Sequence, residues 1–371
     1  MAKILVTGSQ GFIGKNLVLR LKEEKHDVIE FLVSDSLDKL ESIVSDVDFI
    51  FHLAGVNRPK DEIEFTTGNV NLTKQLIYFI SKLDRDVPVL FTSSIQAEKE
   101  NSYGVSKKKA EEELLTYRDN TGNTLFIYRL PNVFGKWCKP NYNSVVATFC
   151  HNVINDIPLV IHDEKAIVNL VYIDDVVNDF ILQLRVSSVE QNRVFKGIKP
   201  VYQISVGELA NKLKQFKESR VSLVTDNVGS GLSRALYSTY LSYMAPDHFS
   251  YTVPVYSDER GSFSELIKTP EHGQFSFFTA KPGIIRGGHY HHTKNEKFIV
   301  VKGEALFGFK NMDTGEYVEI TVSSEKIEIV ETIPGWAHNI KNIGNDEMVV
   351  LLWANEIFDR EKPDTIYAEI M

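Results

Sequence analysis

The stretch at residues 6–14, VTGSQGFIG, decides the fold of the N-terminal half. Its glycines follow the spacing G-x-x-G-x-x-G, after an apolar run and before a helical pattern. In that context the missing side chains let backbone N–H groups approach a pyrophosphate, and the helix N-terminus adds a favourable dipole. A plain turn between a strand and a helix also uses such glycines. The glycine spacing alone does not predict a dinucleotide site, and further motifs in the sequence are needed.

Short apolar runs alternate with longer amphipathic stretches through residues 1–180. Strands are expected at 3–7, 27–33, 48–53, 87–92 and 124–130, and helices at 14–24, 73–83 and 105–117. This alternation predicts a parallel sheet with helices on both faces. We expect an α/β Rossmann-like domain over residues 1–245.

The pattern changes after about residue 251, where short β-rich runs follow one another between turns. No long helical period continues there, which favours a small all-β barrel or jelly roll over residues 246–371. The segment 226–258, with Gly229-Ser230-Gly231, is the expected boundary region.

Composition restricts the class of protein. The 371 residues suit two domains, and 43% hydrophobic with 25% charged residues is ordinary for a globular protein. No apolar run approaches the ~20 residues of a membrane helix, and no signal peptide precedes the first strand. Cys138 and Cys150 alone allow no disulfide framework, so a cytoplasmic location is expected. The net charge of −9 argues against a nucleic-acid partner.

A second chemical signal is Tyr103-Gly104-Val105-Ser106-Lys107. The Y-x-x-x-K spacing at the start of a helix places the two side chains one turn apart. The lysine ammonium is then expected to favour tyrosinate and to lower the pKa of Tyr103, which makes it a usable proton donor or acceptor. Ser94 ends an upstream strand, where its hydroxyl can hydrogen-bond a carbonyl oxygen.

A third signal lies near the end of the chain. His289 and His291 stand two residues apart, so in a strand they point to one side and His292 points to the other. Glu296 follows beyond a turn, and His338 comes from the distant stretch PGWAH. Three imidazoles and one carboxylate suit Zn²⁺, and also Fe²⁺, Mn²⁺ or Ni²⁺. A pocket that uses these residues without a metal is the rival interpretation.

Residues 1–245 resemble the extended short-chain dehydrogenase/reductases that act on nucleotide sugars. The matching pieces are the glycine loop, HLAG (52–55), Asn69, Ser94, Tyr103, Lys107, RLPNVFG (129–135) and YIDD (172–175). The resemblance implies that Ser94, Tyr103 and Lys107 are catalytic and that Asn132, with Lys136 nearby, contacts the nucleotide sugar. It implies a cofactor site of Gly8, Gly11, Phe12, Ile13, Gly14, Leu53, Ala54, Gly55, Tyr103 and Lys107.

The same family resemblance narrows the reaction. Its 4,6-dehydratases carry an Asp-Glu pair after the strand-end Ser or Thr, where this chain has Ile95-Gln96. Reduction and 4-epimerisation remain open. Glu30 is expected inside the second strand and Asp35 in the loop beyond it, so no clear acid marks an NAD site. This favours NADP(H).

The C-terminal spacing resembles the two motifs of the cupins, which implies His289, His291, Glu296 and His338 as metal ligands. RGGHYH (286–291) and DERGSFSE (258–265) also resemble metal-free sugar-nucleotide 3,5-epimerases, in which the histidine matching His289 is the base. A metal-bound imidazole nitrogen cannot also take a proton. We keep His289 as a ligand and leave the base unassigned.

The two-domain order resembles the bifunctional epimerase/reductases of capsular polysaccharide synthesis. That resemblance implies C3 epimerisation of a UDP-2-acetamido-2,6-dideoxy-4-hexulose in the cupin domain, followed by NADPH-dependent C4 reduction. It implies UDP-2-acetamido-2,6-dideoxy-L-talose as the product, toward UDP-N-acetyl-L-fucosamine, and also a zinc ion and a homodimer. One alternative is a single-activity reductase or 4-epimerase whose cupin domain only binds sugar or drives dimerisation. Another is a redox-sensing regulator that binds NADP(H) without turnover.

Overall fold

The computed structural model of the chain describes residues 1–185, 194–254, 256–258, 261–263, 273–356 and 361–370. The chain divides into two compact units. The first contains Met1–Val133 and Asn169–Gln203, and the second contains Phe134–Val168 and Ile204–Met371. Among the helices in these described ranges, none has the length and apolar character that crossing a bilayer requires.

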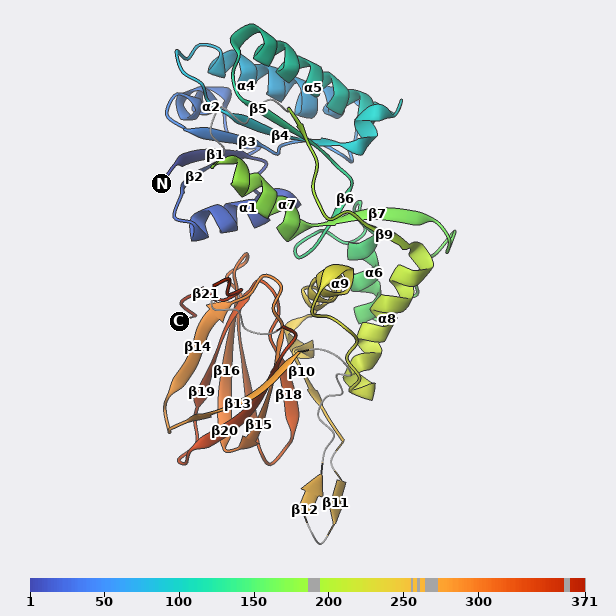
Figure 1. The fold of residues 1–371 in the computed structure, drawn as a ribbon, viewed down its shortest axis with the longest axis vertical. Helices are drawn as coiled ribbons and strands as arrows, with labels where there is room; N and C mark the ends of the chain where they lie inside the picture. The colour runs from blue at the N-terminus through green and yellow to red at the C-terminus, as the bar shows by residue number, and fades with distance from the viewer. Residues whose placement is uncertain (186–193, 255, 259–260, 264–272, 357–360, 371) are drawn as a thin grey trace. The chain divides into compact units, whose positions relative to one another are not determined.

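The first unit is built on a six-stranded parallel sheet in the order β2-β1-β3-β4-β5-β8 (Figure 1). Its strands are β1 (Lys3–Thr7), β2 (Asp27–Phe31), β3 (Phe49–His52), β4 (Val89–Ser94), β5 (Leu125–Leu130) and β8 (Phe195–Lys196). The predicted alternation of parallel strands and helices is confirmed, with ends shifted by a few residues.

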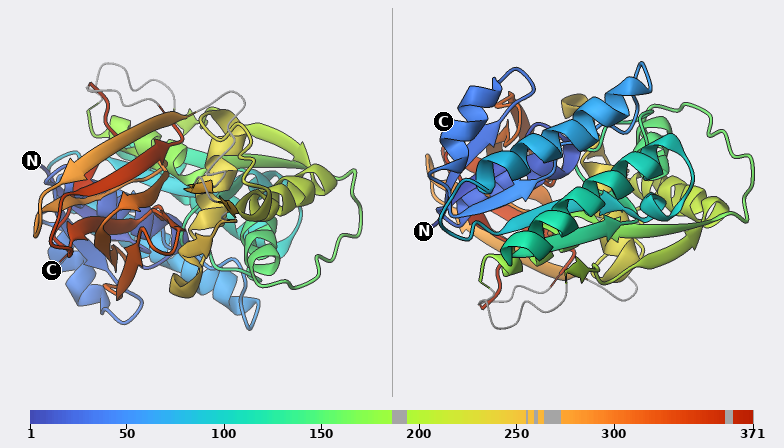
Figure 2. Two further views of the ribbon diagram at one scale, coloured as in Figure 1. Left: turned by 90° about the horizontal axis from the view of Figure 1, so that it is seen from below. Right: turned by 90° about the horizontal axis from the view of Figure 1, so that it is seen from above.

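Helices cover both faces of this sheet. One face carries α2 (Leu37–Val44), α4 (Leu72–Ile80) and α5 (Ser102–Thr121), and Figure 2, right, looks onto α4 and α5. The other face carries α1 (Phe12–Glu23) and α7 (Ile173–Gln183). Short helices at α3 (Ile63–Phe65), η1 (Thr66–Asn71) and η2 (Ile95–Glu98) lie in the connections. Because both faces are covered, the central strands are mostly apolar.

The local sequence fixes the start of α5, the helix that carries Tyr103. The Asn101 side-chain oxygen accepts a hydrogen bond from Gly104 N at 2.8 Å, which caps the first turn. Gly122, at φ +74°, ends the helix in a left-handed conformation that a glycine adopts without strain. Tyr103 therefore lies in the first turn of α5, which follows β4 and the short helix η2.

The second unit contains two five-stranded antiparallel sheets. The first has the order β10-β18-β15-β20-β13, from β10 (Ser250–Thr252), β18 (Glu328–Glu331), β15 (Glu296–Lys302), β20 (Met348–Ala354) and β13 (Gln274–Ala280). The second has the order β17-β16-β19-β14-β21, from β17 (Tyr317–Ser323), β16 (Glu304–Asn311), β19 (Trp336–Asn342), β14 (Ile285–Tyr290) and β21 (Ile366–Tyr367). The two sheets meet in an apolar core, where the rings of Phe298 and Phe307 are 5.6 Å apart. The β-rich C-terminal region is confirmed.

Further elements complete the second unit. They are α6 (Val145–Ile154), α8 (Val206–Ser222), α9 (Gly231–Leu241), η4 (Pro246–His248) and the hairpin of β11 (Tyr256–Asp258) with β12 (Gly261–Phe263). The strands β6 (Asn132–Phe134), β7 (Ile167–Tyr172) and β9 (Tyr202–Ser205) form a three-stranded sheet, within which the chain passes from one unit to the other.

A buried ion pair joins helices and strands of the second unit. Lys297 Nζ lies 2.9 Å from Glu331 Oε1, with the two side chains 3% and 1% exposed. Arg220 of α8 approaches the other carboxylate oxygen at 3.5 Å, and the Tyr237 hydroxyl of α9 donates to Glu331 at 3.3 Å. The unit thus includes α8 and α9 with the strands. A domain boundary after residue 245 stays a proposal.

Candidate active site and metal centre

The glycine loop lies between β1 and α1 and contacts the segment after β3. Gly8 has φ +69°, and a Cβ there would lie 2.7 Å from Ala54 N. A Cβ at Gly14 would lie 2.2 Å from Gly8 O, so neither position admits a side chain. The helix begins at Phe12, and no described side chain caps its N-terminus. Its N–H groups are therefore available to a phosphate.

The HLAG segment is held against this loop through His52. Ala54 N donates to Thr7 Oγ1 at 3.2 Å, and Thr73 Oγ1 donates to Asn69 O at 2.7 Å. Thr73 Oγ1 therefore accepts from His52 Nε2 at 2.9 Å, and His52 Nδ1 accepts from Thr7 Oγ1 at 2.9 Å. Burial lowers the pKa of His52 to about 3, so this ring is neutral at neutral pH. The predicted cofactor residues Leu53, Ala54 and Gly55 directly follow His52, whose ring these hydrogen bonds hold in place.

Lys107 lies buried beside Gly55. Its Nζ donates to Thr92 O at 2.9 Å, and a Cβ on Gly55 would lie 3.0 Å from Nζ and 2.9 Å from Asn69 Oδ1. Burial lowers the pKa of Lys107 to about 8, although the nearby Glu111 carboxylate opposes the shift. The glycine at 55 thus leaves room for the ammonium group close to the cofactor loop.

The pKa shift expected for Tyr103 is wrong in direction. Burial raises the pKa of Tyr103, and the side-chain hydrogen bond with Ser94 only partly offsets it. Lys107 donates its hydrogen bond to Thr92 O. In this state Tyr103 is a protonated acid at neutral pH.

The two predicted substrate contacts lie in different surroundings. Asn132 is exposed on β6, and its side-chain amide donates to Asn169 O at 3.1 Å. Lys136 is only 1% exposed. Its aliphatic stem and the Trp137 ring pack where a Cβ of Gly335 would lie, at 3.5 and 2.8 Å. A role for Lys136 in binding substrate remains a proposal.

The second unit brings the four predicted metal ligands together. His289 in β14 pairs with His338 in β19, after a register shift between Gly287 and His289. Glu296 begins β15. One ligand atom from each of His289, His291, Glu296 and His338 lies within 4.8 Å of the other three. The ring centroids of the three imidazoles are 4.7–5.2 Å apart.

The polar atoms of this cluster fit a cation. His291 Nδ1 donates to the backbone carbonyl of Asp364, which in the neutral ring turns the Nε2 lone pair toward Glu296 Oε2, 3.2 Å away. His338 is 2% exposed, and neither of its ring nitrogens has a hydrogen-bond partner among the described residues, although Nε2 lies 3.3 Å from Glu296 Oε2. Lone pairs that face one another across such distances are stabilised by an ion between them.

Electrostatics support neutral rings at His289 and His338 beside an ionised carboxylate. Burial, followed by the neighbouring rings of His338 and His291, lowers the pKa of His289 to about 3. Burial likewise lowers the pKa of His338. Burial opposes ionisation of Glu296, but contacts with His291 and His338 hold its pKa well below the usual range. These are the protonation states that metal ligation requires.

Two neighbours of these sites were not predicted. Glu111 lies four residues after Lys107 on α5, a spacing from which it could have been found, and it holds Arg129 through two oxygens at 2.6–3.2 Å. Asp364 contacts the loop of residues 292–294, about 70 residues earlier in the chain, and no sequence pattern links the two. Part of the DERGSFSE stretch, at 259–260 and 264–265, lies outside the described residues.

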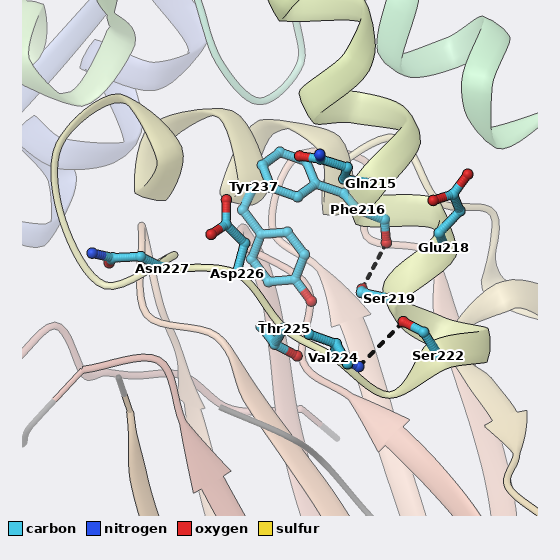
Figure 3. Close-up of a pocket in the computed structure, with 10 residues that line it drawn as sticks. All are labelled: Gln215, Phe216, Glu218, Ser219, Ser222, Val224, Thr225, Asp226, Asn227 and Tyr237. Atoms are coloured by element: carbon cyan, nitrogen blue, oxygen red, sulfur yellow. Dashed lines mark hydrogen bonds between the residues drawn. The ribbon is translucent and has the colours of Figure 1, made fainter. Parts of the chain in front are cut away.

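One pocket, of about 480 Å³, lies within the second unit (Figure 3). It is lined by the end of α8, the following loop and Tyr237 of α9. The Ser219 hydroxyl donates to Phe216 O at 2.8 Å, and Ser222 Oγ accepts from Val224 N at 3.2 Å. No residue predicted as catalytic, cofactor-binding or metal-binding is among those that line it.

Comparison with known proteins places these sites in context. Residues 4–196 match the NAD dependent epimerase/dehydratase family, and residues 256–366 match the polysaccharide biosynthesis C-terminal domain. A UDP-2-acetamido-2,6-beta-L-arabino-hexul-4-ose reductase of Pseudomonas aeruginosa is 56% identical over 364 residues, which are 98% of this chain and 97% of that protein.

Solved structures give the same picture. The capsular polysaccharide assembling protein CapF of Staphylococcus aureus superposes with a TM-score of 0.68 at 41% identity, over 99% of this chain and all of that chain. A UDP-glucuronic acid 4-epimerase of Bacillus cereus, solved with NAD, is 22% identical with a TM-score of 0.52 and covers 58% of this chain and 84% of its own. That last likeness concerns the fold alone.

Proposed function

This chain belongs to the NAD dependent epimerase/dehydratase family, and on that premise we propose that it is a nucleotide-sugar reductase of capsule or O-antigen synthesis. The substrate is a UDP-2-acetamido-2,6-dideoxy-4-hexulose. The product is UDP-2-acetamido-2,6-dideoxy-L-talose, toward UDP-N-acetyl-L-fucosamine. The observation that carries this proposal is the 56% identity to a UDP-hexulose reductase along nearly the whole chain.

The first unit performs the reduction of the C4 ketone. The glycine loop would hold NADPH, which would supply the hydride when bound. Tyr103 is protonated and gives its hydroxyl proton to the ketone oxygen, while the Ser94 hydroxyl orients the carbonyl. Lys107, with a pKa of about 8, is mostly charged at neutral pH and stabilises the tyrosinate that remains.

The preference for NADP(H) rests on the acids near the end of β2. Glu30 lies within the strand, and its carboxylate pairs with Lys22 Nζ at 3.0 Å. Asp35 accepts hydrogen bonds from Leu32 N and Lys39 Nζ, both at 2.8 Å. Carboxylates engaged in this way repel a 2′-phosphate less than a free acid at the strand end.

We propose that residues 246–371 form a cupin-type jelly roll that inverts C3 of the same sugar. His289, His291, Glu296 and His338 would hold Zn²⁺, which supplies positive charge near the ketone oxygen. The proton on C3 is acidic because the enolate can be stabilised beside the C4 ketone. A ligand imidazole nitrogen cannot act as the base while it binds the ion. The homodimer and the cytoplasmic location stay predictions.

The full-length chain tests both activities. The 4-keto sugar nucleotide is supplied in deuterated water without NADPH, and deuterium at C3 is followed by NMR. When NADPH is added, Tyr103→Phe should oxidise it at least about 10²-fold more slowly than the wild type does. In the assay without NADPH, the same variant should still incorporate deuterium at C3. Tyr78→Phe, on the exposed face of α4, serves as the matched control.

The alternative is a single-activity reductase or 4-epimerase whose C-terminal domain binds sugar or drives dimerisation. It predicts no deuterium at C3 above a buffer control, and it predicts that His338→Ala changes stability alone. Wild-type exchange that disappears in His338→Ala would reject it.

A further inference from the structure

We propose that Asp364 is a positioning residue for the metal centre, which makes the C-terminal segment around it part of that site. This inference rests on the proposed metal binding. Asp364 is not one of the four ligands. Its carboxylate and its backbone carbonyl both contact the loop that carries His291.

The carboxylate binds three consecutive backbone N–H groups. Oδ1 accepts from His292 N at 2.9 Å, and Oδ2 accepts from Thr293 N at 2.6 Å and Lys294 N at 2.7 Å. The Thr293 hydroxyl donates to the same Oδ2 at 3.0 Å. Four charge-assisted bonds to one carboxylate fix the backbone between two proposed ligands, His291 and Glu296.

The backbone carbonyl of Asp364 acts on a ligand directly. It accepts a hydrogen bond from His291 Nδ1, so the neutral ring carries its proton there and presents Nε2 to the cluster. The His291 carbonyl is held from the other side, where it accepts from Gly335 N at 3.1 Å. The ring and the backbone of His291 are thus fixed independently, and only the ring contact depends on where Asp364 lies.

The same loop places a cation beside Glu296. Lys294 Nζ lies 3.2 Å from Glu296 Oε1 and donates to Thr365 Oγ1 at 3.3 Å. Thr365 directly follows Asp364, so one segment orients both an imidazole ligand and the charge next to the carboxylate ligand. Loss of the Asp364 carboxylate removes its hydrogen bonds to the N–H groups of 292–294 and so loosens the loop that carries both groups.

The test measures zinc affinity of the full chain by competition with a chelator. Asp364→Ala should weaken zinc binding by about 10–100-fold. Asp364→Asn should fall in between, because its amide keeps one acceptor and turns a donor toward the N–H groups. The control Glu369→Ala removes an exposed carboxylate from the same segment and should bind zinc like the wild type.

Cobalt substitution separates positioning from general destabilisation. The visible spectrum of Co²⁺ in Asp364→Ala should differ from that of wild type and of Glu369→Ala, because one imidazole is no longer held in the ligand geometry. Unchanged zinc affinity and an unchanged Co²⁺ spectrum in both Asp364 variants would overturn the inference alone. A wild-type chain that binds no more zinc than His338→Ala would instead overturn the proposed metal site, and this inference with it.

Discussion

Gly55→Ala probes the contact between the cofactor loop and the buried lysine. The new methyl carbon would lie 2.9 Å from Asn69 Oδ1 and 3.0 Å from Lys107 Nζ, closer than side chains normally tolerate. Neither neighbour moves cheaply. Asn69 is held by Val56 N at 2.7 Å, Val56 O at 2.9 Å and Ser106 Oγ at 2.9 Å, and Lys107 is held by Thr92 O at 2.9 Å.

The expected effect follows from these bonds. Displacing either group breaks at least one buried hydrogen bond, so the free energy of unfolding should fall by about 1–3 kcal/mol. A shift of Lys107 by about 1 Å should reduce kcat roughly 10²-fold, which corresponds to about 2.7 kcal/mol in the activation barrier. The two effects differ in kind, since the first concerns folding and the second concerns the placement of charge near Tyr103.

The assay follows NADPH oxidation with the 4-keto sugar nucleotide, together with urea unfolding of the same samples. Gly197→Ala is the matched control, because a Cβ there meets nothing within 4 Å. If Gly55→Ala retains kcat within about twofold of Gly197→Ala, the placement of Lys107 is not the constraint that we infer.

Two further predictions concern stability. Glu331→Gln should lower the free energy of unfolding by about 3–5 kcal/mol, because it leaves Lys297 buried without its counter-charge. The double replacement Lys297→Met/Glu331→Leu should lower it by less, and a larger loss in the double variant would contradict the argument. Burial lowers the pKa of His52 to about 3, below its unfolded value of about 6.5, so unfolding takes up a proton between those values. The contribution of His52 to the free energy of unfolding is therefore complete above about pH 6.5 and should fall by about 1.4 kcal/mol per pH unit below it. In His52→Gln, the free energy of unfolding measured with urea should depend less steeply on pH across that window.

The sequence predicted what local patterns encode. Alternating apolar runs gave the parallel strands, and the glycine spacing gave the loop between β1 and α1, because Gly8 and Gly14 leave no space for side chains. Strand alternation also predicted that His289 and His291 meet one another. The cluster forms even though a register shift lies next to His289.

Local patterns could not predict long-range contacts or how deeply a side chain is buried. The spacing of Tyr103 and Lys107 indicated an attraction between their charges, whereas the depth at which Tyr103 is buried decides the direction of its pKa shift. The role of Asp364 depends on a loop about 70 residues earlier in the chain. A boundary at residue 245 was inferred from the change in local sequence pattern, which carries no information about what Glu331 binds.

The partners of Glu331 bear on how the two halves can be separated. Cutting the polypeptide after residue 245 would remove Arg220 and Tyr237 from a buried carboxylate. It would also remove the Ser238 hydroxyl, which donates to Thr293 O at 3.0 Å. A C-terminal fragment that folds should therefore begin before α8. Transfer of these strands to another gene would therefore have to include the sequence of α8 and α9 as well.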